Sequence, residues 1–316
     1  MNRAAINQKL SKIPTQVIIV LVLIIWLVPT IGLFVTSFRP VKEINTSGWW
    51  KAFSTTQSPG QPRFTLSNYV DAIVGYRGTR SYLEECKAGT SLAYRCNASD
   101  LLNPRGMGRA FVNSLVVTIP SVILPILFAT FAAYAFSWME FKGRMLIFAV
   151  LVGLQVVPLQ MTLVPVLRMY ANLKMNGTFW GVWLFHTGFG LPYAIYLMRN
   201  YIGGLPKDLF ESAYLDGAST WTAFTKLVVP LAMPAIASLA IFQFLWVWND
   251  LLVSLVFLGG TTPVMTYQIS NMVTSLGAGW HLLTAAAFLS MLLPMVVFFA
   301  LQKYFVRGML AGSVKG

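Results

Sequence analysis

The chain has 316 residues, of which 56% are hydrophobic and 10% are charged, and its mean hydropathy is +0.66. Soluble domains usually carry about a quarter charged residues, so this composition excludes an ordinary water-soluble fold. The formal net charge of +13 would suit a protein that binds nucleic acid. The positions of the charges along the chain distinguish a nucleic-acid-binding protein from a membrane protein.

Uncharged apolar stretches recur along the chain, and each is long enough as a helix to cross a hydrocarbon core of about 30 Å. The last one, from Leu251 to Gln302, is too long for one span, and glycine and proline punctuate its middle as in a loop. We therefore predict an all-α membrane bundle with six transmembrane helices. The predicted spans are 15–37, 110–138, 145–167, 178–199, 235–258 and 282–304.

The first apolar stretch also has the basic residues before it that a signal peptide would have. It is longer than the apolar region of a signal peptide, and no A-x-A cleavage site follows it. We expect a retained membrane anchor, with a cleaved signal peptide as the alternative.

The basic residues predict the orientation of the spans, because Lys and Arg in short connections favour the cytoplasmic side. Six spans place both termini on one side, which would hold eleven basic residues, while the short connections opposite hold only Arg168 and Lys174. Both termini are predicted to be cytoplasmic, in a bacterial inner membrane. The other ten basic residues lie in the segment 39–109, which is too long to influence orientation. The charge of +13 therefore does not indicate a nucleic-acid partner.

The predicted organisation has four parts. They are a cytoplasmic N-terminus with the first span (1–38), an extracytoplasmic insertion (39–109), a five-helix core (110–304) with a cytoplasmic loop at 205–234, and a cytoplasmic tail (305–316). The insertion mixes Gly, Ser, Pro and aromatic residues, which favours a small folded unit. Cys86 and Cys96 are the only cysteines, and an oxidising exterior favours a disulfide between them over two inert thiols.

Ionisable residues are rare inside the predicted spans, where burying them is costly. Asp250, in the sequence WVWND, would face a water-filled path, a partner subunit or the neighbouring Asn249, or else would cap the helix near the outer interface. His186 and His281 have no Cys, Asp or Glu at metal-ligand spacing, so structural histidines are favoured over a metal site. No HExxH, GxSxG or Walker pattern occurs, and we expect no catalytic residues.

The loop at 205–234 predicts two short amphipathic helices. Pro206 suits the first turn, and an apolar face follows at helical spacing in Leu209, Phe210, Ala213 and Tyr214. Gly217 fits a left-handed stop, and Ser219 or Thr220 fits the cap of a second helix.

The second helix would place Trp221, Phe224 and Val228 on one face before Pro230 ends it. Two apolar stripes in a cytoplasmic loop indicate that something packs on them. The alternative is a helix that lies on the lipid surface.

This segment resembles the EAA motif of permease subunits of binding-protein-dependent ABC importers, in which a glycine and a proline-bearing helix follow. The matching residues are Glu211, Ser212, Ala213, Asp216, Gly217, Ala218, Phe224, Pro230 and Pro234. Ser212 departs from the commonest alanine. The resemblance is closest to the MalG-like permeases of the maltose type and extends from the first span to the C-terminal RGMLAGSVKG, with the insertion least covered.

The resemblance implies the type I ABC importer permease fold and a non-catalytic transmembrane subunit. The implied partners are a homologous MalF-like permease, two MalK-like ATPase subunits, an extracytoplasmic solute-binding protein and membrane lipid. No cofactor is expected in this chain, since ATP and Mg²⁺ would bind the ATPases. The EAA helices would dock on the ATPases, and Gly308 to Gly316 would form a second contact. The implied cargo is an oligosaccharide, for which a maltose- or trehalose-like α-glucoside is a candidate.

Polar and aromatic residues inside the spans are candidates for the transport path of a neutral sugar: Gln155, Tyr193, Gln243, Trp246, Asn249 and Asp250. Aromatic residues are also common at membrane interfaces without any ligand. Two other classes remain open. An ion-coupled secondary transporter or channel would carry ionisable residues in several spans, and a membrane enzyme would need a catalytic constellation.

Overall fold

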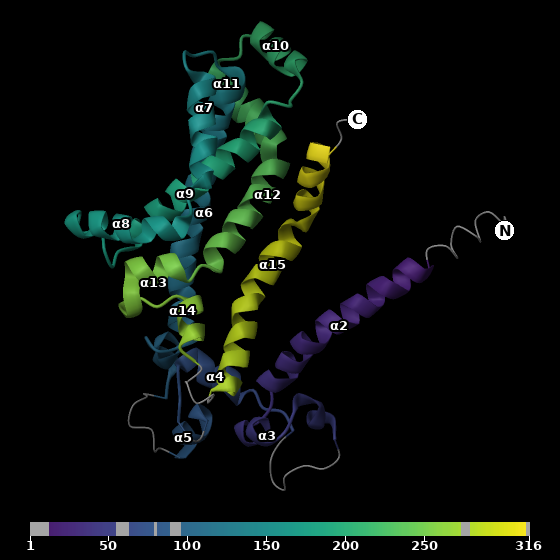
Figure 1. Ribbon diagram of the computed structural model, residues 1–316, viewed down its shortest axis with the longest axis vertical. Coiled ribbons are helices and arrows are strands. Elements are labelled where there is room, and N and C mark those ends of the chain that lie inside the picture. Colours follow the sequence, from purple (N-terminus) through teal and green to yellow (C-terminus); the bar gives the residue numbers. More distant parts are fainter. Residues whose placement is uncertain (1–12, 55–62, 79–80, 89–95, 273–278, 314–316) are drawn as a thin grey trace, which may run out of the picture. The chain divides into compact units, whose positions relative to one another are not determined.

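The computed structural model describes residues 13–54, 63–78, 81–88, 96–272 and 279–313, with side chains for all of them except Ile13 and 304–313. Helices are the regular structure of this part of the chain, which contains no strand (Figure 1). The α-helices are α2 (Ile13–Ser37), α3 (Val41–Thr46), α4 (Ser67–Val74), α5 (Tyr82–Ala88), α6 (Met107–Trp138), α7 (Arg144–Gly153), α8 (Leu159–Asn172), α9 (Phe179–Ile202), α10 (Lys207–Leu215), α11 (Thr220–Ala223), α12 (Val229–Trp248), α13 (Leu252–Leu258), α14 (Met265–Ser270) and α15 (Trp280–Ser313). The 3₁₀ turns are η1 (Trp49–Phe53), η2 (Ala98–Leu102), η3 (Leu154–Val156) and η5 (Gly259–Thr261), and η4 (Phe224–Val228) is a π turn.

The chain divides into two compact units. The first unit comprises Met1–Gly106 with Asn271–Leu289, and the second comprises Met107–Ser270 with Ser290–Gly316. The predicted N-terminal segment before residue 13, part of the predicted loop at 273–278 and the end of the predicted tail at 314–316 lie outside the described residues. Helix α15 continues past the predicted end of the last span at residue 304.

Fewer helices meet the criteria of length and hydropathy for a membrane span than the six spans predicted. Within the described residues, four helices are long and apolar enough to cross a membrane, and a bent helix pair raises the number to five if it counts as one span. The four are Pro14–Ser37, Met107–Trp138, Thr220–Trp248 and Trp280–Lys303. Helix α9 coincides with the predicted fourth span and has 24 residues, but it is not among these helices.

The predicted third span is broken rather than continuous. The helices Arg144–Val156 and Leu159–Asn172 meet at a bend of 100°. Val157, directly before Pro158, has extended backbone angles, because a proline disfavours helical geometry at the residue that precedes it. Pro158 then occupies the position directly before α8.

The predicted fifth span begins and ends earlier than expected. The helix runs from Thr220 to Trp248, through Pro230, so the expectation that Pro230 ends the second loop helix is wrong. The π turn η4 precedes Pro230 and changes the hydrogen-bond spacing where the missing proline N–H interrupts the α-helical ladder. After Trp248 the chain breaks and continues as the separate helix α13.

Small residues let the helices of the second unit approach closely. Alanines are fully or almost fully buried where α6, α9 and α12 pack, as is usual for helix contacts in membranes; they are Ala129, Ala133, Ala194, Ala232 and Ala235. Polar side chains add bonds between helices and loops. Asn113 donates to the carbonyl of Pro263 at 2.8 Å, and the Trp183 indole donates to the carbonyl of Val116 at 2.8 Å.

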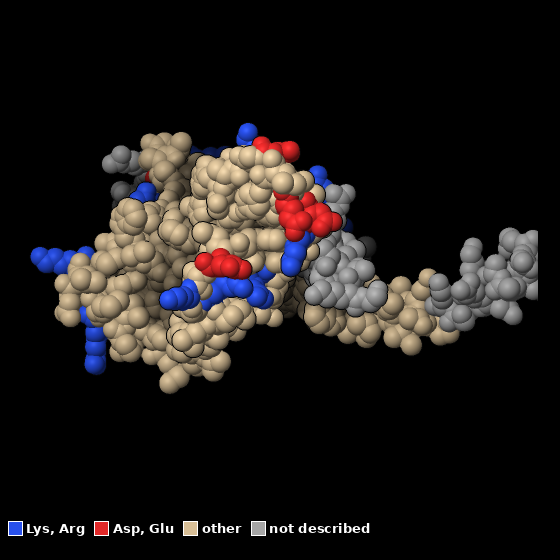
Figure 2. Space-filling view, turned by 90° about the horizontal axis from the view of Figure 1, so that it is seen from above, with Lys and Arg blue, Asp and Glu red and all other residues tan. Residues whose placement is uncertain are grey.

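The α10 end of the second unit carries charged side chains of both signs, among them Lys207, Asp208 and Glu211 of α10. Figure 2 looks at the molecule from this end and shows small acidic and basic groups beside broad uncharged areas.

In the first unit, a buried arginine organises the chain after α2. Arg39 is 2% exposed, and its guanidinium donates to the carbonyls of Glu43 and Ser47 at 2.9 and 3.0 Å. The side chain of Asn68 donates to the carbonyls of Ser37 and Arg39, at 2.9 Å each. These bonds fix α3 and α4 against the end of α2.

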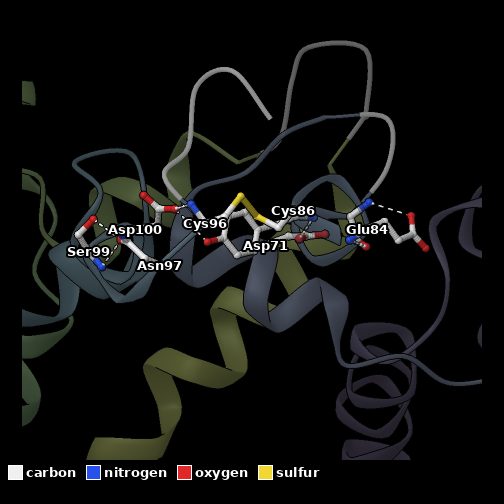
Figure 3. The surroundings of a disulfide bond; sticks show 9 residues. Asp71, Glu84, Cys86, Cys96, Asn97, Ser99 and Asp100 are labelled. Atoms are coloured by element: carbon white, nitrogen blue, oxygen red, sulfur yellow. Dashed lines mark hydrogen bonds between the residues drawn. A yellow bond between two sulfur atoms is a disulfide. The ribbon is translucent and has the colours of Figure 1, made fainter. Parts of the chain in front are cut away.

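The insertion contains short helices held by a disulfide and two buried carboxylates. The sulfur atoms of Cys86 and Cys96 are bonded, with Cα atoms 5.5 Å apart (Figure 3). Asp100 accepts hydrogen bonds from the Cys96 N–H at 2.7 Å and from the Tyr82 hydroxyl at 2.9 Å. Asp71 accepts one from the Tyr82 N–H at 2.7 Å. A small segment without a large core of its own is stabilised in this way by covalent and polar links.

Burial of Asp71 predicts a pH-dependent stability of the insertion. Burial raises the pKa of Asp71 to about 6, the Tyr82 N–H opposes this rise, and the charge of Glu84 adds to it. The folded state therefore binds the proton more tightly than the unfolded state, whose pKa is near 3.8. Stability from this group is present at low pH and is lost as the pH rises through about 6.

Asp71→Asn should keep the bond to the Tyr82 N–H and remove the cost of the buried charge. Hydrogen exchange of α5, compared between the two proteins at the same pH, should be slower in the variant at pH 7, and the difference should shrink at pH 5. Equal exchange of the two proteins at pH 7 would contradict the prediction.

Candidate functional site

The loop helix α10 is fixed by one buried aromatic side chain. Phe210 is 2% exposed, and its ring stacks on Trp138 with centroids 3.7 Å apart. Trp138 ends α6, and its indole donates to the carbonyl of Ile202 at 3.0 Å. The sequence placed Phe210 on an apolar face but carried no indication of its partner on α6. The stacked pair ties α10 to the ends of α6 and α9.

Two further aromatic contacts join the loop to α6. The hydroxyl groups of Tyr134 and Tyr214 lie 3.1 Å apart. Phe224 is 5% exposed, and its ring stacks on Phe131 at 4.7 Å. Of the predicted apolar faces, Phe210, Phe224 and Val228 are therefore buried against the protein's own bundle, whereas Leu209, Tyr214 and Trp221 remain 39%, 44% and 62% exposed.

The opposite edge of α10 stays exposed. Leu215 is 88% exposed, and Glu211, Ser212 and Asp216 are also exposed. An apolar side chain this exposed, between carboxylates and at the end of an anchored helix, is available to a partner.

Gly217 ends α10 with a left-handed turn, as the sequence predicted. Its φ is +81°, its N–H donates to the Tyr214 carbonyl at 3.0 Å, and the Ala218 N–H donates to the Ala213 carbonyl at 2.9 Å. These two bonds form a Schellman motif. No atom lies within 4 Å of a Cβ added at Gly217, so the backbone angle alone favours glycine here.

The second loop helix starts at a serine cap. The Ser219 hydroxyl accepts from the Thr222 N–H at 3.2 Å, so Ser219 rather than Thr220 is the cap. Among the other motif residues, Ala213 and Ala218 are half-buried and Pro230 is exposed.

The six candidate path residues fall into different environments. Gln243 is 4% exposed, and its amide donates to the Ser121 carbonyl at 3.1 Å. A Cβ at Gly190 would lie 2.7 Å from this amide, so the glycine makes room for it. In this structure Gln243 holds α12 to α6.

Asp250 caps the start of α13. Its carboxylate accepts from the Val253 and Ser254 N–H groups at 3.0 and 3.2 Å. It also lies 3.8 Å from Nε2 of His186, which is fully buried. The sequence around His186 suggested an isolated histidine, but the structure places Asp250 beside it. The contacts of Asp250 with the Val253 and Ser254 N–H groups match the helix-capping alternative.

Trp246 and Asn249 lie near Asp250 and are more exposed. The Trp246 ring centroid is 5.2 Å from that of His186, and 37% of the tryptophan is exposed. Asn249 is exposed and donates to the Leu245 carbonyl at 2.8 Å.

Gln155 and Tyr193 line a cavity of about 380 Å³ in the second unit. The bend between α7 and α8 supplies one wall, and α9 supplies the other. Phe189 and Gly188, which the sequence did not single out, also line it. Six residues scattered over several spans carried no pattern that could separate the cavity-lining pair from the others.

Within the part of the chain that the structure describes, no three His, Cys, Asp or Glu side chains lie close enough to hold a metal ion.

Residues 110–311 match the family model described as binding-protein-dependent transport system inner membrane component. Two curated relatives cover nearly the whole chain. The chain is 53% identical to the osmoprotective compounds uptake permease protein GgtD of Synechocystis sp., over 96% of this chain and 93% of the relative. It is 40% identical to the alpha-glucoside transport system permease protein AglG of Rhizobium meliloti, over 94% and 96%.

The fold is similar to that of a chain in a bacterial ABC transporter involved in the import of the acidic polysaccharide alginate. The TM-score is 0.64 at 18% identity, over 95% of this chain and 98% of that chain. Members of the matched family are non-catalytic membrane components. The chain therefore belongs to the family of binding-protein-dependent transport system inner membrane components, as an ABC importer permease.

Proposed function

We propose that this chain is one permease subunit of an ATP-driven importer for a neutral oligosaccharide of the α-glucoside class, and that α10 and α11 couple it to the ATPase subunits. The observation that carries the coupling role is the two-sided build of α10. Phe210 is buried on Trp138, whereas Leu215 is 88% exposed. A helix that is fixed to the bundle on one side and open on the other can pass a push from a partner into α6 and α9.

The cargo and the partners are inferred from the relatives. One relative is an alpha-glucoside permease, and another similar chain belongs to an alginate transporter in complex with a pentasaccharide-bound periplasmic protein, at a TM-score of 0.56. We infer a homologous permease, two ATPases and an extracytoplasmic solute-binding protein as partners, with ATP and Mg²⁺ on the ATPases.

The basic residues of the short connections support cytoplasmic termini and an extracytoplasmic insertion. The disulfide between Cys86 and Cys96 in the insertion suits the oxidising side of the membrane. This orientation places α10 and α11 in the cytoplasm, where the ATPases would bind.

Leu215→Asp should weaken ATPase binding without unfolding the permease. Exposed substitutions usually change stability by about 0.5 kcal/mol or less, whereas loss of an apolar anchor in an interface costs about 2 kcal/mol or more. ATPase retained with the purified permease in mild detergent should fall, with an unchanged melting temperature. Leu173→Asp, at a 60% exposed position after α8, is the control.

Undiminished ATPase retention by the Leu215 variant would overturn the docking role. Failure of the unmodified permease to retain any ATPase would instead favour a transporter that works without one.

Phe210→Ala should leave docking residues in place but loosen their connection to α6. Removal of a buried phenylalanine costs about 3–5 kcal/mol, and exchange of amide hydrogens in α10 should accelerate. In proteoliposomes with the partner subunits, maltose uptake per ATP hydrolysed should fall. Coupling equal to that of the unmodified protein, despite faster exchange, would show that the stack does not transmit the motion.

Gly217→Val should impair coupling through backbone strain alone, because a left-handed conformation costs a residue with a Cβ about 1–2 kcal/mol. Sugar-stimulated ATP hydrolysis and uptake should both decrease. Gly177→Val is the matched control, since Gly177 also has positive φ, at +76°, and open space around its Cβ position. Equal effects of the two substitutions would contradict a specific role for the α10–α11 turn.

A further inference from the structure

We infer that the cavity at the bend between α7 and α8 is a subsite for one ring of the transported sugar, with Gln155 and Tyr193 as its polar contacts. This inference rests on the proposed function, because it concerns the cargo of the same importer. It adds a site on this permease and the residues that form it.

The bend places backbone polar groups beside the cavity. Between the end of α7 at Gly153 and the start of α8 at Leu159, the chain passes through a short 3₁₀ turn and an extended residue, Val157. Non-helical backbone at membrane depth is tolerated only where protein covers it or where it lines a water-filled space. The adjoining cavity, lined by Leu154, Gln155 and Val157, supplies such a space.

The opposite wall also departs from regular helix bonding. Pro192 in α9 has no N–H, so it cannot donate to the carbonyl of Gly188, four residues earlier. Both residues line the cavity. The bend between α7 and α8 therefore faces a proline-bearing turn of the continuous helix α9 across one space.

The polar side chains of the cavity are open to a ligand. Neither the Gln155 amide nor the Tyr193 hydroxyl has a hydrogen-bond partner among the described residues, and both side chains are exposed, Tyr193 at 42%. An amide offers two donors and an acceptor, and a phenol offers one donor and an acceptor, a set that suits the hydroxyl groups of a sugar.

The rest of the lining fits a neutral ring. Phe189 and Pro192 provide an apolar wall, which can pack against the C–H face of a pyranose, and none of the described residues that line the cavity is charged. A volume of about 380 Å³ lies near the lower end of the range of about 300–1,000 Å³ for small-molecule sites. The cavity is therefore suited to a single ring rather than to a whole oligosaccharide.

The structure provides a direct way to probe this space. No atom lies within 4 Å of a Cβ added at Gly188 or at Gly153, so both positions accept a cysteine without a clash. Gly188 lines the cavity and Gly153 does not. The native cysteines, Cys86 and Cys96, are paired in the disulfide, so the introduced thiol is the reactive one.

The test uses the importer assembled with its partner subunits and binding protein in proteoliposomes, with maltose and trehalose as probes. In Gly188→Cys, either sugar should slow maleimide labelling during ATP-driven transport by about threefold or more, while labelling of Gly153→Cys should not change. Tyr193→Phe and Gln155→Ala should each raise the half-saturating sugar concentration about fivefold, the factor expected for one lost hydrogen bond. Gly188→Leu, which fills the cavity, should reduce uptake at least tenfold with unchanged ATPase retention.

If the unmodified importer takes up sugar but sugar does not slow maleimide labelling of Gly188→Cys, the subsite is overturned and the proposed function stands. Unchanged transport by the Gly188→Leu variant would do the same, since a lipid chain or a partner's side chain would then fill the cavity. Absence of uptake of either sugar by the unmodified importer would overturn both the α-glucoside assignment and the subsite.

Discussion

The need to satisfy every backbone N–H and C=O group inside a bilayer shapes this structure more than any other constraint. It explains why the described chain is helical. Wherever a helix is interrupted, the freed backbone groups need other hydrogen-bond partners. The bend at Val157 lies on a cavity. The break after Trp248 is capped by the Asp250 carboxylate, which accepts the first free N–H groups of α13. At these two interruptions of helical hydrogen bonding, a cavity or a capping side chain adjoins the backbone.

The loop helices α10 and α11 have one side that packs on the bundle and one side that is exposed. Aromatic rings hold α10 and the π turn to α6 through three separate contacts, while the exposed edge keeps its leucine and carboxylates free of the bundle. Rings that stack on a helix end resist both sliding and rotation. We expect a loop held in this way to move with the helices, as the proposed coupling role requires.

Sequence reasoning succeeded where a local rule decides the outcome. Gly217 adopts the left-handed stop, and Ser219 caps the following helix, because each depends only on residues nearby. The all-helical membrane class followed from composition in the same way, and the family comparisons agree with it.

Sequence reasoning failed where the outcome depends on residues that are distant in the sequence. Pro158 follows a break between two helices, whereas Pro230 lies in the first turn of α12 within a helix that continues from Thr220 to Trp248. The pairing of Phe210 with Trp138, and of His186 with Asp250, depends on packing between helices, which one sequence does not display.

The π turn at Phe224–Val228 has a geometric consequence for the helix that contains it. A π turn holds roughly one residue more than an α turn, so the segment before it is rotated by about 100° relative to the segment after it. A helical wheel drawn continuously from Thr220 to Trp248 would therefore assign one of the two segments to the wrong side. Deletion of a single residue within the turn would restore the regular phase and swing Trp221 away from the Phe131 ring on which it stacks, so the length of this helix is as much a determinant of its surface as its composition.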